Sequence, residues 1–196
     1  MDELAAVLVA ARDEERTIGR TVSALKEAFP GVEVIVADDG SRDGTPLQAE
    51  RAGARVVRLP RLGKGQALTL GEAEAAAGRL LLCDADLRGD LRPLVESGAG
   101  LAIAAFAEKQ GGGFGIAKQA GRALIRALSG FEAREPLSGQ RALTAAARRS
   151  CFPLAAGFGC EVRMTVDAAR AGLEIEERRV GKECGYQCRS RWSPYH

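Results

Sequence analysis

Two aspartates separated by one residue are the strongest chemical signal in this sequence. Asp84-Ala85-Asp86 directly follows the apolar run at residues 79–83. Alternate residues of a strand point to the same side, roughly 7 Å apart, so the two carboxylates can supply hard oxygen ligands to Mg²⁺ or Mn²⁺. For an isolated motif, capping of a helix at residues 91–95 by Asp86 or Asp90 would be the better explanation.

A second acidic motif follows another apolar run. Asp38-Asp39-Gly40-Ser41 comes directly after residues 32–37. Acidic side chains at a strand end can accept hydrogen bonds from a base N–H or from ribose hydroxyls. Turn chemistry explains the same residues equally well, because Asp, Gly and Ser all favour turns.

The third motif is Gly63-Lys64-Gly65, before an expected helix at residues 66–77. Glycines let backbone N–H groups approach phosphate, and a helix N-terminus favours anions. The segment is not a Walker A loop, because Gly65 stands where Ser or Thr belongs, and Leu68 takes the place of the third glycine of a dinucleotide-binding loop.

The elements that must position these motifs alternate between strands and helices. Apolar runs predict strands at 4–11, 32–37, 54–59, 79–83 and 100–106, and helical spacing predicts helices at 14–29, 44–52, 66–77, 116–128 and 160–171. This alternation predicts an α/β fold with a mostly parallel sheet covered by helices. Ligands bind at the carboxyl ends of the strands in such sheets, where both acidic motifs are expected.

Composition excludes several classes of protein. The 28 Lys and Arg residues against 26 Asp and Glu give a net charge of +2, which argues against a nucleic-acid partner. No apolar run has the length of a membrane span, and the acidic N-terminus is unlike a signal peptide, so we expect a cytoplasmic protein. Residues 1–175 contain no histidine, which excludes Ser-His-Asp chemistry there. We expect Cys83, Cys151 and Cys160 to be small buried residues, and Arg148-Arg149 to lie on a solvated face.

The C-terminal residues differ in composition from the rest. Trp192, both tyrosines and His196 lie there, and residues 176–184 read EERRVGKEC. The codons GAA GAG CGT CGT GTA GGG AAA GAG TGT encode this string and resemble a common sequencing adapter. We therefore expect a domain at residues 1–176, truncated before its natural C-terminus, and a non-native tail at 177–196. A natural Cys-rich tail is the alternative.

Taken together and in order, these motifs resemble those of the family 2 glycosyltransferases. The matching segments are AARDEER at 10–16, VADDGSRDGT at 36–45, GKGQAL at 63–68, LLCDADL at 81–87, PLSGQR at 136–141 and GFGCEV at 157–162. The resemblance covers residues 4–175 and is nearest to the polyprenyl-phosphate sugar synthases. One departure is Asp13, since the family usually has Asn before the glutamate that Glu14 matches.

The resemblance implies a GT-A type fold and a metal-dependent, inverting transfer from a UDP- or GDP-linked sugar. The residues that it places at the donor are Ala10, Glu14, Asp38, Asp39, Lys64 and Asp84. It implies that Asp84 and Asp86 hold Mg²⁺ or Mn²⁺, with Asp86 as the expected direct ligand. The catalytic residues that it implies are Asp86, Glu161 and Arg141, with Arg141 near a donor or acceptor phosphate.

The acceptor is less well defined by the sequence. A sugar hydroxyl needs a general base, for which Glu161 and Glu135 are candidates, whereas a lipid phosphate is already ionised and needs none. We favour a phosphate, with a polyprenyl phosphate at the inner membrane face as one candidate acceptor. Two alternatives stay open, a nucleotidyltransferase of related fold and a non-catalytic sugar-nucleotide-binding domain. Residues 12–15, RDEE, count against the nucleotidyltransferase, which usually has a Gly-rich segment with Arg and Lys there.

Overall fold

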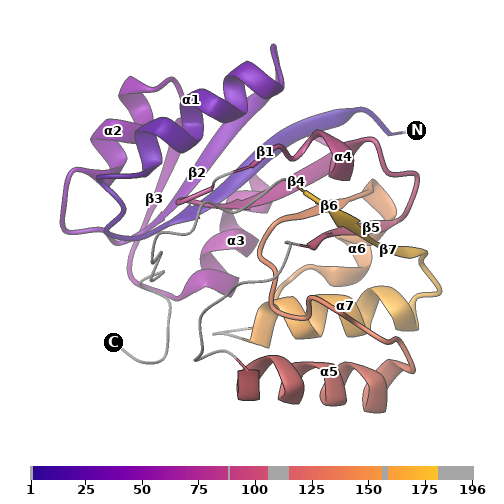
Figure 1. The fold of residues 1–196 in the computed structure, drawn as a ribbon. Helices are drawn as coiled ribbons and strands as arrows, with labels where there is room; N and C mark the ends of the chain where they lie inside the picture. The colour runs from indigo at the N-terminus through magenta and orange to yellow at the C-terminus, as the bar shows by residue number, and fades with distance from the viewer. Residues whose placement is uncertain (1, 88, 106–114, 156–158, 181–196) are drawn as a thin grey trace.

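One mixed sheet organises the fold. The computed structural model describes residues 2–87, 89–105, 115–155 and 159–180 (Figure 1). Within them the sheet has seven strands in the order β3-β2-β1-β4-β6-β5-β7. The strands are β1 (Leu4–Ala11), β2 (Glu33–Asp39), β3 (Arg55–Leu59), β4 (Arg79–Asp84), β5 (Leu101–Ala105), β6 (Arg141–Leu143) and β7 (Ile175–Arg179). The expected mostly parallel α/β sheet is therefore confirmed.

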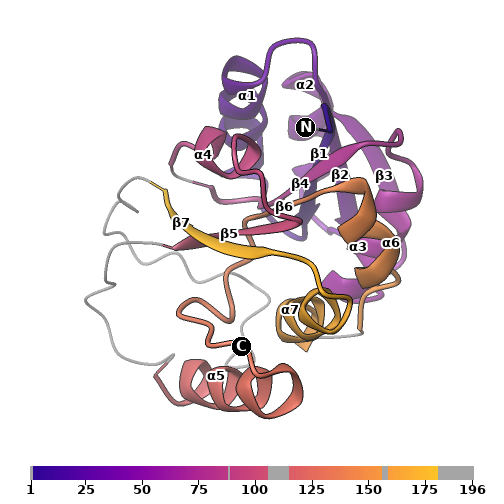
Figure 2. The ribbon, with the colours of Figure 1, turned by 90° about the vertical axis from the view of Figure 1, so that its right-hand side faces the viewer.

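Helices cover both faces of this sheet, as the two views in Figures 1 and 2 show. The helices are α1 (Ile18–Ala28), α2 (Thr45–Arg51), α3 (Lys64–Ala73), α4 (Arg92–Val95), α5 (Gly115–Ser129), α6 (Ala145–Cys151) and α7 (Cys160–Arg170). Helices α1, α2 and α4 lie on one side, and α3, α6 and α7 lie on the other, with α5 packed outside α7.

Strand β1 shows why the sequence forms these layers. Its residues 6–11 are all buried, and side chains along a strand alternate between faces. Val7 and Val9 pack in the cluster with Ile18 and Val22 of α1. Leu8 packs in the other cluster, with residues of α3, α6 and α7. A strand buried on both faces reads as a continuous apolar run, as parallel strands between helices do.

The carboxyl ends of the central parallel strands meet at one edge. In the register of the sheet, Ala11 of β1 pairs with Asp38 of β2, and Ala10 of β1 pairs with Asp84 of β4. The two acidic motifs thus lie on either side of the end of β1. This confirms the prediction that they share one edge of the sheet.

Strand β6 breaks the parallel pattern. It runs antiparallel to both β4 and β5 and was not predicted, nor was α6. Only three residues form β6, and its first residue is Arg141, so neither length nor alternation gives a strand signal. Its position between β4 and β5 brings the segment before it, residues 136–140, next to the end of β4.

The C-terminal part bears on the expected tail. The expected boundary between residues 176 and 177 falls inside β7, which pairs with β5 from Ile175 to Arg179, and Val180 is buried. Residues 181–196, including Trp192 and His196, lie outside the described residues. The non-native origin of the tail stays a prediction.

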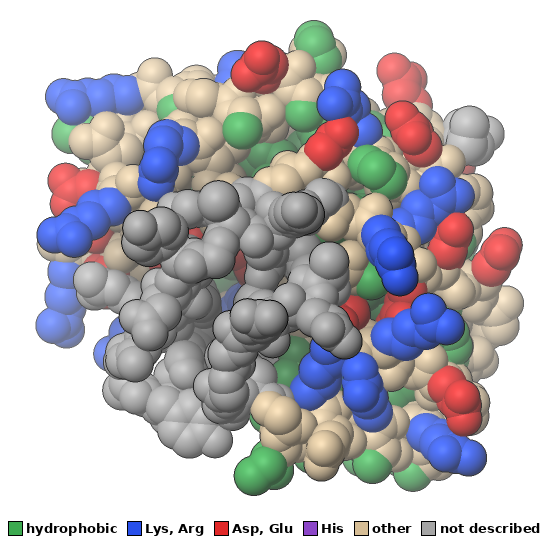
Figure 3. Space-filling model, viewed as in Figure 1, with side chains coloured by type: hydrophobic (Ala, Val, Ile, Leu, Met, Phe, Trp, Pro, Cys, Tyr) green, Lys and Arg blue, Asp and Glu red, His purple; other side chains and the backbone are tan. Residues whose placement is uncertain are grey.

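The surface agrees with the balanced charge. On the face in Figure 3, basic and acidic side chains are interspersed over the part of the molecule that the structure describes. Among the described residues, no helix combines the length and the apolar character that crossing a bilayer requires.

Candidate active site

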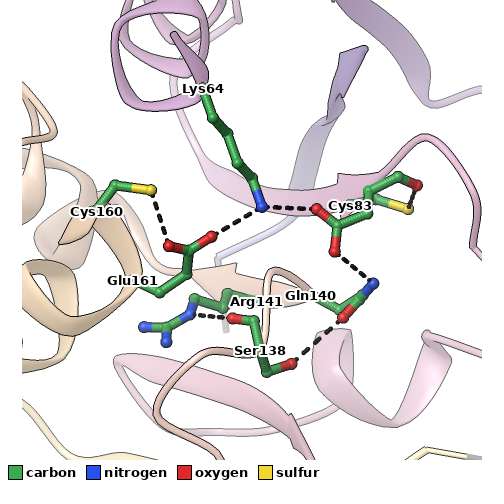
Figure 4. Close-up of polar contacts among 8 residues, drawn as sticks. Lys64, Cys83, Ser138, Gln140, Arg141, Cys160 and Glu161 are labelled. Carbon is green, nitrogen blue, oxygen red and sulfur yellow. Dashed lines mark hydrogen bonds and ion pairs between the residues drawn. The ribbon is translucent and has the colours of Figure 1, made fainter. Parts of the chain in front are cut away.

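Lys64 is the centre of a buried ion-pair cluster. Its Nζ donates to Asp84 Oδ1 at 2.7 Å and to Glu161 Oε1 at 2.8 Å (Figure 4). Lys64 is the first residue of α3, Asp84 the last of β4, and Glu161 lies in the first turn of α7. Only 13% of the Lys64 side chain is exposed. Three elements far apart in sequence therefore place one cation between two anions.

Electrostatic attraction favours the charged forms of Lys64 and Glu161. Burial by itself lowers the pKa of Lys64, but attraction to Asp84 and Glu161 outweighs it, so the pKa lies well above its ordinary value. Burial likewise raises the pKa of Glu161, yet Lys64 and a hydrogen bond from Cys160 bring it below its ordinary value. Paired charges tolerate burial that an isolated charge would not.

The cysteine beside Glu161 stays a thiol. Burial and the neighbouring Glu161 carboxylate raise the pKa of Cys160 to about 12, and its Sγ donates to Glu161 Oε2 at 3.0 Å. Cys83, Cys151 and Cys160 are all buried, as the sequence predicted. None of the three has the lowered pKa that a nucleophilic thiolate needs.

The second oxygen of Asp84 is held from the other side. Gln140 Nε2 donates to Asp84 Oδ2 at 3.0 Å, and Gly139 lies so close that an added Cβ would be 2.5 Å from the same oxygen. Both residues precede β6. Each oxygen of Asp84 therefore has a protein partner.

Asp86 differs from Asp84 in this respect. It lies in the turn after β4 and is half-buried, and its carboxylate makes no hydrogen bond or ion pair with the residues that the structure describes. Asp90, not Asp86, receives the N–H of Arg92 at the start of α4, at 2.9 Å. Helix capping therefore explains Asp90, and Asp86 has no partner among the residues that the structure describes.

Asp38 and Asp39 lie at the end of β2, both buried. Asp39 Oδ1 accepts the N–H groups of Leu62 and Gly63 at 2.6 and 2.9 Å, so these two donors are not available to phosphate as the sequence had suggested. Asp38 Oδ1 and Asp39 Oδ2 are buried with no hydrogen-bond partner in the described structure. Burial raises the pKa of Asp38, partly offset by Ser41.

The loops after β1 and β2 are tied together. Asp13 has a positive φ of 52°; its N–H donates to Ser41 Oγ at 2.9 Å, and its Oδ1 accepts the N–H of Arg42 at 2.8 Å. The N–H of Glu14 donates to Thr45 Oγ1 at 2.7 Å. An aspartate is well suited to this position, because its short side chain tolerates the left-handed region.

Glu14 and Ala10, the other two residues expected at the sugar-nucleotide donor, lie at the same edge of the sheet. Glu14 Oε2 accepts a hydrogen bond from Thr17 Oγ1 at 2.7 Å. Ala10 is 2% exposed and lies in β1 between β2 and β4. Ala10 therefore contributes backbone and close packing to the edge, without a polar side chain.

Arg141 does not lie where a phosphate could reach its guanidinium. It is fully buried and donates through Nε to Ser138 O at 2.7 Å, through Nη1 to Thr165 Oγ1 at 2.9 Å, and through Nη2 to Pro136 O at 3.2 Å. All three acceptors belong to the protein. The expected contact with phosphate is replaced in this structure by contacts that hold residues 136–138 against α7.

Glu135 lies apart from the cluster. Its Oε1 accepts from Lys118 Nζ of α5 at 2.7 Å, and its N–H donates to Glu177 Oε1 at 2.9 Å. Neither Glu135 nor Glu161 has a carboxylate free of a cation. The two candidate bases are therefore both engaged in ion pairs.

Comparisons with known proteins match the part of the chain that forms this edge of the sheet. A model of the family described as glycosyl transferase family 2 matches residues 6–97, which include both acidic motifs. Glycosyltransferase AglJ of Haloferax volcanii is 32% identical over 181 residues, covering 86% of this chain and 59% of AglJ. Over residues 6–97, this chain matches glycosyl transferase family 2.

Other relatives of this chain are glucosyl-3-phosphoglycerate synthases. The enzyme of Mycolicibacterium paratuberculosis is 31% identical over 201 residues, covering 86% of this chain and 61% of the relative. The chain thus spans about three fifths of the length of these curated relatives.

Solved structures show the same architecture. The Mycobacterium tuberculosis glucosyl-3-phosphoglycerate synthase in complex with Mg²⁺ and uridine diphosphate has a TM-score of 0.79 and 28% identity, covering 94% of this chain and 72% of that one. Its complex with Mn²⁺, uridine diphosphate and glucosyl-3-phosphoglycerate has a TM-score of 0.77. The GT-A type fold predicted for this chain is confirmed.

Sequence reasoning missed part of this site. Gln140 and Ser138 lie in the matched PLSGQR segment, but only Arg141 was singled out there. Thr165 gave no signal, because a threonine in the middle of a helix is unremarkable. The spacing Glu161–Thr165, four residues apart on one helix face, was the available clue to their contact, in which Thr165 Oγ1 donates to Glu161 O at 3.0 Å.

Proposed function

We propose that this chain is the catalytic domain of a glycosyltransferase that moves a sugar from a UDP-sugar to a phosphate-bearing acceptor. The observation that carries the proposal is the Lys64–Asp84–Glu161 cluster at the edge where β2, β1 and β4 end. UDP is favoured over GDP because the similar solved structures contain uridine diphosphate.

Two parts of this edge would bind different parts of the sugar-nucleotide donor. Asp38 and Asp39 each have one buried oxygen without a partner among the described residues, suited to the N–H and O–H donors of a base and ribose. The N-terminus of α3 lies beside Lys64 and favours the negative charge of a diphosphate. Glu14 completes the nucleotide side, and the Asp84 cluster lies on the sugar side.

A divalent cation fits this donor set through Asp86. Its carboxylate is free of partners in the described structure, whereas both oxygens of Asp84 already accept hydrogen bonds. Mg²⁺ and Mn²⁺ take few protein carboxylates and complete their shell with water and phosphate oxygens. When bound, the cation would neutralise charge on the leaving diphosphate. Asp86 would hold it, with Asp84 alongside.

The state of the candidate bases guides the choice of acceptor. Inversion at a sugar carbon by a hydroxyl acceptor needs a base opposite the leaving group. Glu161 is paired with Lys64 and Glu135 with Lys118, so neither is poised to take a proton. An acceptor that arrives ionised, such as a phosphate, removes this requirement and is compatible with the inversion that the family resemblance implies.

Two phosphate-bearing molecules are candidates for the acceptor. The M. tuberculosis relative has been solved with phosphoglyceric acid, and the sequence motifs resemble those of polyprenyl-phosphate sugar synthases. The relatives reported above do not support a lipid phosphate, so phosphoglyceric acid is the first acceptor to test, and a product linked through its hydroxyl would contradict the argument for an ionised acceptor group. The polyprenyl phosphate is the second, presented in detergent micelles.

The test is product analysis with UDP-sugars and Mn²⁺. Release of UDP together with a glycosylated phosphoglycerate or polyprenyl phosphate would support the proposal, and the anomeric configuration of the product by NMR would test inversion. Retention of the donor configuration would overturn the inverting part. Release of pyrophosphate would indicate a nucleotidyltransferase instead. Tight UDP–Mn²⁺ binding without turnover of any donor would indicate a non-catalytic binding domain.

A further inference from the structure

Asp84 belongs to a closed ring of polar contacts. On one side the ring runs from Asp84 Oδ1 through Lys64 to Glu161 of α7. On the other side it runs from Asp84 Oδ2 to Gln140, whose Oε1 accepts from Ser138 Oγ at 3.3 Å. Figure 4 shows Lys64, Glu161, Gln140 and Ser138 converging around the end of β4.

Arg141 and Thr165 close this ring. Arg141 Nε donates to Ser138 O, and its Nη1 donates to Thr165 Oγ1. Thr165 Oγ1 in turn donates to the backbone carbonyl of Glu161, on the same helix. The guanidinium therefore connects the segment that carries Gln140 to the helix that carries Glu161.

Three members of the ring are shielded from solvent. Arg141 and Thr165 are fully buried and Gln140 is 6% exposed, so none offers a large surface to a substrate. A buried guanidinium is costly unless its donors are satisfied, and here three protein oxygens accept from it. Two cations, Lys64 and Arg141, face two anions, Asp84 and Glu161, which balances the buried charge.

We propose that Gln140, Arg141 and Thr165 are positioning residues that hold the Asp84 carboxylate and the Lys64 ammonium in a single orientation for the donor. The inference rests on the proposed function for its kinetic consequence. These residues act by holding Asp84 and Lys64 in place and do not themselves contact the sugar or the diphosphate. A site loosened by about 1 Å loses much of its rate even when binding persists.

Two pairs of variants separate positioning from general stability. Thr165→Val removes the acceptor for Arg141 at nearly constant shape, and Thr165→Ser keeps the hydroxyl. Gln140→Met removes the amide that donates to Asp84 at similar length, and Gln119→Met makes the same change on the exposed surface of α5. Each is measured for kcat and KM with UDP-sugar, for Kd of UDP with Mn²⁺, and for Tm.

An NMR readout of Lys64 needs no turnover. The ammonium of Lys64, held by two carboxylates, should give a protected ¹⁵N–¹H signal that the Lys64→Arg variant lacks and so assigns. A change in its chemical shift or exchange rate reports a change in the ring directly.

The expected result is selective. Thr165→Val and Gln140→Met should each lower kcat about 10-fold to 100-fold, with Kd for UDP within about twofold because Asp38, Asp39 and Asp86 lie outside the ring. Both should shift the Lys64 signal, whereas Thr165→Ser and Gln119→Met should not. The double variant Thr165→Val/Gln140→Met should lose less than the product of the single losses, because both act through Asp84.

Other outcomes overturn the inference. If Thr165→Val and Gln140→Met leave both kcat and the Lys64 signal unchanged, the ring does not position the cluster. If kcat, UDP affinity and Tm fall together in proportion, the residues are structural only. A parent protein without transfer activity contradicts the proposed function alone, and the Lys64 signal in the four variants then decides the inference by itself.

Discussion

Gly139 packs directly against the carboxylate of Asp84, so that an added Cβ would lie 2.5 and 2.6 Å from its two oxygens. No carbon approaches an oxygen that closely without something moving, and the carboxylate is the end of a short side chain. Its partners Lys64 and Gln140 restrict where it can move. The segment before β6 therefore limits the position of the first aspartate of the acidic motif.

We predict that Gly139→Ala lowers donor turnover about 10-fold to 100-fold while Tm changes little, because displacement of Asp84 disturbs the site more than the core. Turnover of UDP-sugar and a melting curve check this. Gly98→Ala is the control, since a Cβ there meets nothing within 4 Å. Equal activity of the two variants would contradict the role given to the close packing.

Asp86→Asn should abolish the part of UDP binding that depends on Mn²⁺ and leave Tm unchanged. The reason is that the Asp86 carboxylate has no partner in the described structure whose loss could destabilise the fold. Calorimetric titration with UDP, with Mn²⁺ and with EDTA, measures the effect. Asp90→Asn is the matched control, because Asp90 contacts Arg92 of α4 instead. Unaltered Mn²⁺-dependent binding by Asp86→Asn would remove the metal assignment.

Asp38→Asn should stabilise the fold at neutral pH while weakening nucleotide binding. Burial raises the pKa of Asp38 above its ordinary value of 3.8, so the native state holds this proton more tightly than the unfolded state. The ionised carboxylate then costs stability, and that cost grows as pH rises from about 3.8 through the folded pKa.

The measurement is a pair of unfolding curves for Asp38→Asn and the parent. At pH 7 the variant should be more stable by on the order of 1 kcal/mol, the usual cost of one buried unpaired polar group, and near pH 3 the difference should vanish. A variant that is less stable than the parent at pH 7 would show that the hydrogen bonds from Ser41 outweigh the cost of burying the Asp38 charge.

Arg148 and Arg149 should differ sharply despite being neighbours. Arg148 is 8% exposed and donates to Glu72 Oε1 at 2.8 Å and to the carbonyls of Ala76 and Gly78, whereas Arg149 is exposed. The expectation of a solvated pair was therefore wrong for Arg148. Arg148→Met should cost about 3 kcal/mol of unfolding free energy, because it leaves Glu72 without its cation.

Arg149→Met is the control for this pair and should change stability by about 0.5 kcal/mol or less. Denaturant unfolding of both variants gives the comparison. Similar losses for the two substitutions would mean that the buried contacts of Arg148 contribute nothing beyond those of an exposed arginine.

Because β7 extends past the expected boundary at residue 177, the effect of truncation should depend on where the chain is cut. Removing residues 181–196 should leave Tm unchanged, because a segment that was never selected to pack adds no stability. Removing residues 177–196 should lower Tm, because it deletes most of β7, the buried Val180 and the Glu177 carboxylate that accepts from Arg134 and Glu135. A clear drop in Tm on removing 181–196 would favour a natural tail.

The sequence by itself determined the elements whose signal is local. The apolar runs located β1 to β5, and the acidic motifs lay at strand ends, so the shared edge followed from the general behaviour of parallel sheets. Burial of the three cysteines was also foreseen. Each of these depends on residue type and short-range periodicity, which a single segment carries without reference to the rest of the chain.

Only the tertiary structure decided which side chains meet. Lys64 and Glu161 are 97 positions apart, and nothing in either segment specifies the other. Arg141 matched a motif associated with phosphate, yet the fold buries it among three protein acceptors. The three-residue β6 is a strand only because β4 and β5 flank it. Contacts between distant segments depend on how the layers pack, and that packing is a property of the whole chain.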